Sequence, residues 1–273
     1  MSQTPDAARI GQGPAGPRLG VMEAVRMGWR LMMADFWRLW VVAFVFMVVM
    51  MGANMLGIVA TVLVLPPMLA GLFHVVARRI DGGPAEVGDV FAGFKERFGQ
   101  SVVGLLPLTL GSVVFAVLVA LVIAVLVALG IGIAVAAEGE DEVVAVVVIV
   151  GVLLLLAVEL VLLAGLLVFG LFFRFVPAAV WDHPESGWAA AKASARLVRD
   201  HFFPMLGLLL LFWLIGMAAE LLGMLACCVG VFFTVPAVMA WYVPTIVYLY
   251  RSWTGRPLAV PAGGENSLTP VKA

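Results

Sequence analysis

Residues 143–173 read VVAVVVIVGVLLLLAVELVLLAGLLVFGLFF and carry a single charged side chain, that of Glu159. A helix of about 20 mainly apolar residues crosses the ~30 Å hydrocarbon core of a bilayer, so this stretch is long enough to span a membrane. Further stretches of the chain are similarly poor in charge: 39–55, 57–77, 101–137, 202–226 and 227–250. The sequence therefore predicts an all-α, polytopic integral membrane protein with six transmembrane helices.

The composition indicates the same class of protein. The chain has 273 residues, of which 64% are hydrophobic and 12% charged, and its mean hydropathy is +1.13. A water-soluble fold could not cover that much apolar surface. In hydrocarbon every backbone amide needs a partner within the protein, which a helix provides, and the alternating pattern of a membrane barrel is absent from the sequence.

The stretch 39–77 leaves two interpretations open, a long helix with a re-entrant piece or a tight hairpin that breaks near Gly52, Ala53 and Asn54. The hairpin places every Lys and Arg of the chain on one side of the membrane, whereas a five-span threading sends four of them across. These cations are Arg9, Arg18, Arg26, Arg30, Arg38, Arg78, Arg79, Lys95, Arg97, Arg174, Lys192, Arg196, Arg199, Arg251, Arg256 and Lys272. The other side keeps the acidic run 138–142. Because cytoplasmic loops carry the excess of Lys and Arg, we expect both termini to lie in the cytoplasm.

The two ends of the chain differ from the body. Residues 1–20 and 254–273 are polar and rich in Gly and Pro, and the first segment lacks the apolar core of a signal peptide. Both are predicted to be disordered cytoplasmic tails, and 21–253 to be the membrane domain. The net charge of −1 gives no reason to expect binding to nucleic acid.

An internal repeat is suggested by residues 24–40 and 190–206. At one offset, Arg26 pairs with Lys192, Arg30 with Arg196, Leu31 with Leu197 and Phe36 with Phe202. Each copy is followed by an apolar hairpin that contains prolines and returns to Arg and Gly. We therefore predict a parallel two-fold repeat, with repeat one at 21–84, inserted spans at 101–173 and repeat two at 186–257. The alternative is two unrelated helices that each precede a span.

Each copy opens with a segment of helical periodicity. In the first segment one apolar stripe is expected to oppose Glu23, Arg26 and Arg30, and it comprises Val21, Met22, Val25, Trp29, Met32, Met33 and Phe36. In the second segment Ser186 is available as an N-cap, and the apolar stripe comprises Trp188, Ala191, Ala195, Val198 and Phe202.

Such amphipathic helices suit the cytoplasmic leaflet of a membrane. We predict contacts with anionic lipid at Arg26, Arg30, Lys192, Arg196 and Arg199. The alternative is that the helices are elbows leading into spans, with no role in recognition. Residues 90–99, VFAGFKERFG, form a shorter third candidate.

Two segments resemble known bacterial families. Residues 65–94, LPPMLAGLFHVVARRIDGGPAEVGDVFAGF, are similar to the signature of a family of uncharacterised inner-membrane proteins, in which a Pro-x-x-x-Gly-Leu span ends in Arg. Residues 187–203, GWAAAKASARLVRDHFF, resemble the second-half motif of related multi-span families, including the membrane domain attached to some glycerophosphodiester phosphodiesterases. The resemblance implies a helical, multi-pass protein of the bacterial inner membrane. It carries over no catalytic residue, because the phosphodiesterase domain and its carboxylate and His motifs are missing.

Ionisable residues inside the predicted spans are candidates for a polar or transport site, because charge in hydrocarbon is costly. Glu159 lies near the middle of its span, Glu220 nearer the outer end and His74 near the cytoplasmic end. Glu159 has two interpretations, a carboxyl that couples transport to protons or cations, or a protonated structural group that donates one interhelical hydrogen bond.

The remaining polar groups do not form a recognisable catalytic or metal-binding motif. Asp182, His183 and His201 lack metal-ligand spacing, and Cys227 with Cys228 fits small apolar packing better than a strained vicinal disulfide. We therefore predict no cofactor, no metal and no enzymatic activity. The expected role is structural or lipid-associated in the bacterial envelope, with anionic lipids as partners and a homo-oligomer or a membrane-protein partner possible in addition. The alternatives are a small-molecule or lipid transporter that uses Glu159, and an intramembrane enzyme.

Overall fold

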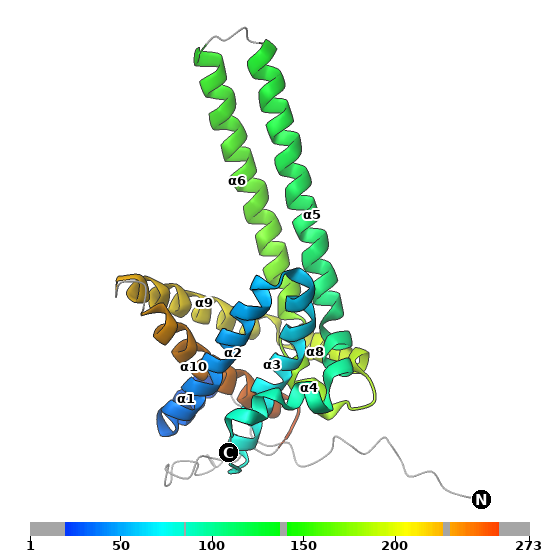
Figure 1. Ribbon diagram of the computed structural model, residues 1–273, viewed down its shortest axis with the longest axis vertical. Helices are drawn as coiled ribbons and strands as arrows, with labels where there is room; N and C mark the ends of the chain where they lie inside the picture. The colour runs from blue at the N-terminus through cyan, green and yellow to red at the C-terminus, as the bar shows by residue number, and fades with distance from the viewer. Residues whose placement is uncertain (1–19, 85, 137–140, 226–229, 257–273) are drawn as a thin grey trace, which may run out of the picture. The chain divides into compact units, whose positions relative to one another are not determined.

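The computed structural model describes residues 20–84, 86–136, 141–225 and 230–256, and in these ranges the chain is helical with no strand (Figure 1). The elements are α1 (Val21–Ala34), α2 (Phe36–Met55), α3 (Ile58–Ile80), the 3₁₀ helix η1 (Val87–Phe91), α4 (Ala92–Glu96), α5 (Phe98–Ala136), α6 (Asp141–Leu171), α7 (Val176–Asp182), α8 (Gly187–Asp200), α9 (Phe202–Leu225) and α10 (Val231–Trp253). The predicted tails, the acidic residues Glu138 and Glu140, and Cys227 with Cys228 lie outside the described residues, apart from Gly20 and residues 254–256.

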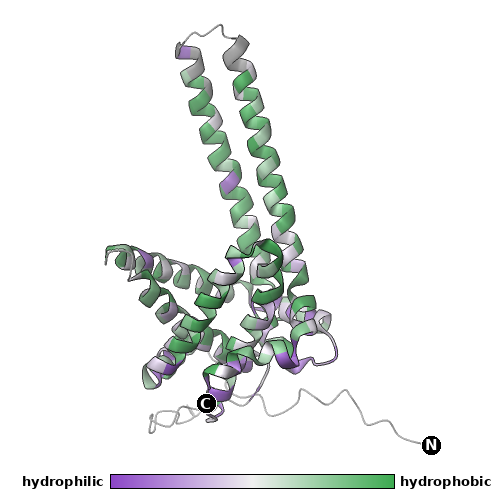
Figure 2. Cartoon of the chain, viewed as in Figure 1, coloured by the Kyte–Doolittle hydropathy of each residue, from purple (hydrophilic) through white to green (hydrophobic). Residues whose placement is uncertain are grey.

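Six of the described helices are long and apolar enough to cross a membrane: α2, α3, α5, α6, α9 and α10. Figure 2 shows hydrophobic residues along these helices, and many large apolar side chains on them are exposed. Exposed apolar surface of this extent suits contact with lipid rather than with water. The prediction of a helical, multi-pass membrane protein is therefore confirmed in this general form.

The first hairpin breaks at a different place from the one predicted. Gly52, Ala53 and Asn54 are helical within α2, and the turn is made by Leu56 and Gly57. Gly57 has a φ of 97°, a conformation that glycine adopts at little cost because it has no Cβ. The interpretation of 39–77 as one long helix with a re-entrant piece is wrong, because α2 and α3 are separate helices.

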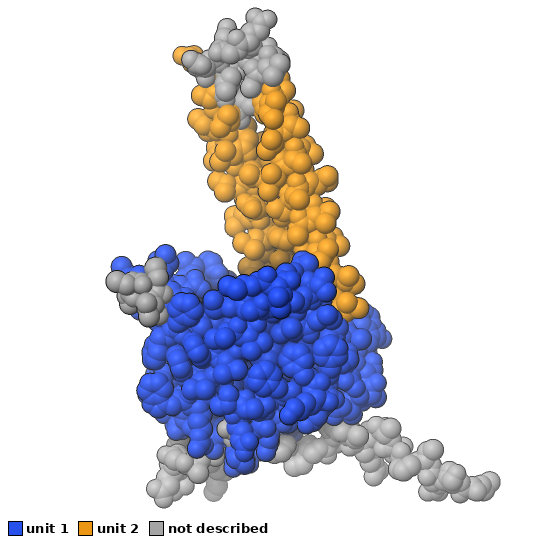
Figure 3. All heavy atoms as spheres, in the orientation of Figure 1, with its two compact units in different colours: residues 1–104, 175–273 blue, residues 105–174 orange. Residues whose placement is uncertain are grey.

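The chain divides into two compact units, shown in different colours in Figure 3. Unit 2, residues 105–174, is the α5–α6 hairpin, in which the ring of Phe169 packs directly against Gly111. None of the apolar span in either helix is buried. The hairpin therefore presents apolar side chains on nearly all sides.

Unit 1 comprises residues 1–104 and 175–273 and has a buried core. Helix α10 lies at its centre and contacts α1, α2, α3 and α9, while α7 packs between α3 and α8. The largest fully buried side chains of this unit include Tyr248, Phe175, Met68, Met205, Leu208, Ile246 and Leu249. The core is thus concentrated around the C-terminal half of α10.

Charged side chains join the helix ends at what we call the base of unit 1, the region around Asp35, Arg79 and Asp81. Arg251 of α10 donates to both carboxylate oxygens of Asp81, at 2.5 and 2.8 Å, and to the carbonyl of Ala77 at 3.2 Å. Asp35, between α1 and α2, lies 2.7 Å from Arg79 of α3. These contacts therefore bring together the start of α2, the end of α3 and the end of α10.

The ends of α3 and α10 have the same capping geometry. The amide of Gly83 donates to the carbonyl of Arg78 at 3.0 Å, and the amide of Arg256 donates to that of Arg251 at 2.8 Å. In each case the preceding glycine has positive φ, 77° at Gly82 and 71° at Gly255, as a Schellman motif requires. This local likeness agrees with the two predicted copies, and the repeat itself stays a prediction.

Helix α10 is steeply inclined to α2 and α3. At its N-terminal end, the carbonyl of Phe233 accepts a hydrogen bond of 3.0 Å from the indole of Trp40, which is close to the start of α2. At its other end, Arg251 is bonded to Asp81, next to the end of α3. Both ends of α10 therefore contact residues near the base. In Figure 1 the end of α9 and the start of α10 lie at the left, away from the turn between α2 and α3.

Helix α1 approaches the backbone of α10 closely at Gly28. A Cβ added at this position would lie 2.9 Å from the amide nitrogen and 3.1 Å from the Cα of Thr245. Backbone atoms of a packed helix cannot move aside as a flexible side chain can. Glycine at position 28 is therefore what allows the two helices to pack at this distance.

We expect Gly28→Ala to destabilise unit 1 by about 1–3 kcal/mol, because the added methyl group forces α1 away from α10. The midpoint of thermal unfolding in detergent micelles measures the effect. Gly52→Ala is the matched control, since nothing lies within 4 Å of a Cβ there. The control should leave stability unchanged or raise it by up to about 1 kcal/mol, as helix propensity favours alanine. Equal midpoints for the two variants would contradict the packing argument.

The ion pair between Asp81 and Arg251 predicts a dependence of stability on pH. The hydrogen bond from Arg251 lowers the pKa of the Asp81 carboxyl below its ordinary value of 3.8, although partial burial opposes this shift. Because the folded-state pKa is the lower one, the pair stabilises the fold above about pH 4 and this stabilisation is lost as the pH falls through the folded-state pKa. The difference in unfolding midpoint between the wild type and Asp81→Asn should therefore be constant from about pH 7 to 5 and shrink below about pH 4. A difference that persists unchanged in acid would show that the charge on Asp81 is irrelevant.

Candidate functional site

A groove of about 210 Å³ between α1 and α10 brings together two basic and two aromatic side chains. It is lined by Val25, Arg26, Trp29, Arg30 and Trp241, and we call it the arginine groove. Two of its residues, Arg26 and Arg30, are among those predicted from the sequence to contact anionic lipid. The other wall, Trp241 of α10, was not predicted, because nothing local in the sequence links it to α1.

Contacts between the two helices fix the shape of the groove. The indole nitrogen of Trp241 donates to the carbonyl of Val25 at 3.0 Å. The rings of Trp29 and Trp241 meet edge to face with their centroids 4.8 Å apart, and Phe212 of α9 supports Trp241 from another side at 5.2 Å. Edge-to-face aromatic pairs and a satisfied indole N–H are both stabilising. The aromatic wall is therefore held in place by the fold.

The exposed side of α1 differs from the predicted one. The residues of α1 that face the protein are Ala24, Val25, Gly28, Leu31 and Met32. Met22, Trp29 and Met33, which were expected to lie opposite the arginines, are 61%, 44% and 58% exposed. The reason is that the small residues Ala24 and Gly28 let α10 approach, so the larger apolar side chains turn outward. Arg26 and Arg30 consequently share the outer surface of α1 with Met and Trp side chains.

The two arginines of the groove are available to an external anion. Both are exposed, and they are four residues apart on α1, a spacing that places side chains side by side on a helix. Neither forms an ion pair within 4.0 Å with a carboxylate of the described residues. Guanidinium groups bind phosphate and carboxylate oxygens through two parallel hydrogen bonds. The groove thus combines an anion-binding group with an apolar floor.

Helix α8 carries the other predicted lipid contacts. Lys192, Arg196 and Arg199 are exposed on it, and the side chain of Ser186 accepts a hydrogen bond from the amide of Ala189, which confirms the predicted N-cap. The ammonium of Lys192 lies 5.7 Å from the centroid of the Trp188 ring, and Arg199 lies 3.7 Å from the neighbouring Asp200. Basic and aromatic side chains are therefore adjacent here too, on the surface and without a groove.

The ionisable residues predicted inside spans occupy different surroundings. Glu159 on α6 and Glu220 on α9 are exposed, and neither has a hydrogen-bond or ion-pair partner among the residues that the structure describes. His74 on α3 is half-buried, and its ring stacks on that of Trp181 with 4.1 Å between centroids. Within unit 1, Glu220 does not line the cavity beside His74.

That cavity is small, about 70 Å³, and the Asp and Arg side chains that line it already form ion pairs. Asp182 accepts a hydrogen bond of 2.5 Å from Tyr250 and lies 2.6 Å from Arg256, while Arg251 is bound to Asp81. Sequence reasoning missed these pairs, because their members are up to 170 residues apart. In the described part of the chain, no three His, Cys, Asp or Glu side chains are grouped so that they could hold a metal ion. The paired groups fit a structural role.

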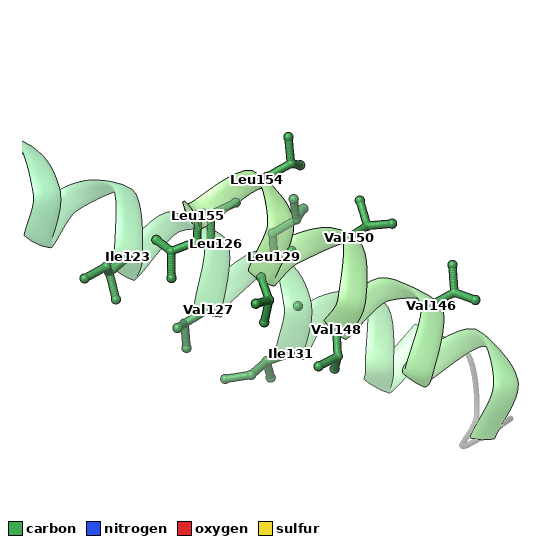
Figure 4. A pocket seen from close by; sticks show the side chains of 13 residues that line it. Ile123, Leu126, Val127, Leu129, Ile131, Val146, Val148, Val150, Leu154 and Leu155 are labelled. Carbon is green, nitrogen blue, oxygen red and sulfur yellow. The ribbon is translucent and has the colours of Figure 1, made fainter. Parts of the chain in front are cut away.

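An apolar groove of about 570 Å³ lies within unit 2, between α5 and α6 (Figure 4). Its lining is made of Ile, Leu, Val and Gly residues from both helices, including Leu126, Leu129, Val150 and Leu154. No side chain of the lining carries a polar group. The groove can therefore accommodate apolar chains.

Comparisons with protein-family models, with curated proteins and with solved structures find no protein similar to this chain.

We expect Trp241→Phe to destabilise unit 1 by about 1 kcal/mol, because phenylalanine keeps the ring contacts but cannot donate to the carbonyl of Val25. Trp213→Phe on α9 is the control, since Trp213 is 54% exposed. Thermal unfolding in detergent should show a lower midpoint for the first variant alone. A fall of the same size in both would mean that loss of any indole, rather than of this hydrogen bond, is responsible.

Proposed function

We propose that this protein is a non-enzymatic, multi-pass protein of the bacterial inner membrane that associates with anionic lipid of the cytoplasmic leaflet. The observation that carries the proposal is the arginine groove, in which Arg26 and Arg30 stand beside Trp29 and Trp241. The sorting of Lys and Arg to one side supports an orientation with both termini in the cytoplasm.

The chemistry of the groove supports a lipid headgroup as its ligand. Arg26 and Arg30 offer donors to a phosphate, while the exposed Met22, Trp29 and Met33 offer apolar contact to the start of the acyl chains. Trp side chains favour the interface between hydrocarbon and water, where such a headgroup lies. Each surface cation contributes about 1 kcal/mol to attraction toward an anionic leaflet.

Helix α8 provides a second basic surface in the copy proposed to be related to α1. Lys192, Arg196 and Arg199 are exposed on it next to Trp188. Under the proposed two-fold repeat, α1 and α8 are equivalent helices that each lead into an apolar hairpin. The repeat thus places two lipid-facing basic helices on the same side of the membrane.

The transporter hypothesis gains no support from the surroundings of Glu159. Its side chain is exposed on α6 and lacks a polar partner among the described residues, whereas coupled transport requires partner groups at a similar depth. Coupling by Glu159, a homo-oligomer and a membrane-protein partner all stay predictions from the sequence.

Removal of the two groove charges should weaken binding of anionic lipid. We expect Arg26→Gln/Arg30→Gln to bind phosphatidylglycerol about tenfold more weakly than the wild type, because two contacts of about 1 kcal/mol each are lost in part. Titration of the detergent-purified protein with phosphatidylglycerol, followed by native mass spectrometry, measures the affinity. Phosphatidylcholine, which has no net charge, should bind equally to both proteins.

The control Arg38→Gln/Lys95→Gln removes the same charge from exposed positions outside the groove. This variant should retain the affinity for phosphatidylglycerol within about twofold. If both double variants lose the same affinity, the binding depends on overall charge and the groove has no special role. Wild-type affinity in the groove variant would refute the proposed function.

A further inference from the structure

The two hairpins of unit 1 cannot both stand upright in a membrane. Phe233 and Arg251 are 18 positions apart on α10, which corresponds to about 27 Å along the helix. Phe233 is nonetheless bonded to Trp40 near the start of α2, and Arg251 to Asp81 beyond the end of α3. If α10 ran alongside α2 and α3, Phe233 would instead lie near the turn between them, at Leu56 and Gly57.

The length of α2 requires this helix to be upright if it crosses the membrane. Helix α2 has 20 residues, or about 30 Å, and therefore just matches the hydrocarbon core when it stands along the membrane normal. Strong tilting of α2 would leave it too short to cross. With α2 and α3 upright, α10 lies close to the membrane plane, and α9 follows it because Phe212 of α9 packs on Trp241 and Tyr242 of α10.

The arginine groove provides independent evidence for the same orientation. Trp241, one wall of the groove, is near the middle of α10, which runs from Val231 to Trp253. If α10 crossed the membrane, Trp241 would lie about 15 Å deep in hydrocarbon, and Arg26 and Arg30 would be buried beside it. An Arg at the bilayer centre costs roughly 2.5–3.5 kcal/mol or more. The arginines have no described carboxylate to offset this cost, so the middle of α10 must lie at the interface.

The apolar surface of α9 fits a position within one leaflet. Its exposed side chains could face the acyl chains, and they include Leu210, Trp213, Leu214, Met217, Leu221, Leu222 and Leu225. Glu220 is exposed on the same helix, and near the interface its carboxylate could reach water. A helix pair with one surface in lipid and charged neighbours at the headgroups is the arrangement of an interfacial anchor.

We propose that α9 and α10 form a hairpin that lies in the cytoplasmic leaflet together with α1 and does not cross the membrane. Four helices then cross, namely α2, α3, α5 and α6, and both termini stay on one side. The inference rests on the orientation in the proposed function and adds the partner surface of α9 and α10, which is the acyl-chain region of the inner leaflet.

Cysteine labelling distinguishes this arrangement from six crossings. In a background of Cys227→Ser and Cys228→Ser, single cysteines are placed at Leu225, Met55 and Asp200. Leu225 and Met55 end α9 and α2 and are 82% and 84% exposed, so they are matched in accessibility to the reagent. Intact cells are treated with a membrane-impermeant maleimide, before and after permeabilisation.

We expect Met55→Cys to be labelled in intact cells, and Asp200→Cys only after permeabilisation. Leu225→Cys should remain unlabelled in intact cells. Labelling of Leu225→Cys from the same side as Met55→Cys would overturn the proposal. A second measurement decides the result if lipid hides both Leu225 and Met55 from the maleimide. An acceptor peptide for biotin ligase is inserted after Leu225, and we expect ligase in the cytoplasm to biotinylate it. Biotinylation by a secreted ligase instead would overturn the proposal.

The test is separate from that of the lipid site. Labelling requires no lipid of a particular charge, and the binding experiment requires no knowledge of topology. If the groove variant keeps wild-type affinity while Leu225→Cys stays inaccessible from outside, the proposed lipid specificity fails and the leaflet hairpin stands.

Discussion

The guanidinium groups of Arg26 and Arg30 on α1 are held beside the middle of α10, and burial of these charges in hydrocarbon would be costly. This constraint determines how unit 1 can sit in a membrane. The fixing is done by Gly28, which lets the backbones of α1 and α10 approach, and by Trp241, whose indole bonds to the carbonyl of Val25. Arg26 and Arg30 cannot move far from Trp241 without breaking this packing. The depth of α10 therefore follows from the need of two cations for water or phosphate.

The ion pairs at the base supply the complementary constraint. Arg251 is only 10% exposed and makes three hydrogen bonds to Asp81 and Ala77, so the end of α10 is tied to the end of α3. Asp35 ties the start of α2 to Arg79 in the same region. These ion pairs therefore hold the start of α2, the end of α3 and the end of α10 together. Together with Trp40, which holds the other end of α10, these contacts set its inclination.

The sequence predicted the position and the apolar character of each long helix. It did not predict the angles at which the helices pack against one another. Long runs such as 143–173 predict spanning helices because hydrocarbon admits little else, and the helices lie close to the predicted ranges. The inclination of α10 was not predictable, because residues 201–250 contain no Lys or Arg. The distribution of basic residues therefore does not indicate on which side of the membrane the segment between α9 and α10 lies. Only the arginines of the groove were predicted, because their spacing within α1 is visible in the local sequence. Trp241 was not, because it is 216 positions from its partner Val25.

A hairpin confined to one leaflet links the proposed binding of lipid to the depth of α10 in the membrane. Helices α1, α9 and α10 would lie together in the cytoplasmic leaflet, where Arg26 and Arg30 meet the anionic headgroups. Binding of lipid and insertion of the hairpin would then reinforce each other, because both stabilise the same depth of α10. The groove and the depth of α10 therefore depend on the same contacts between α1 and α10.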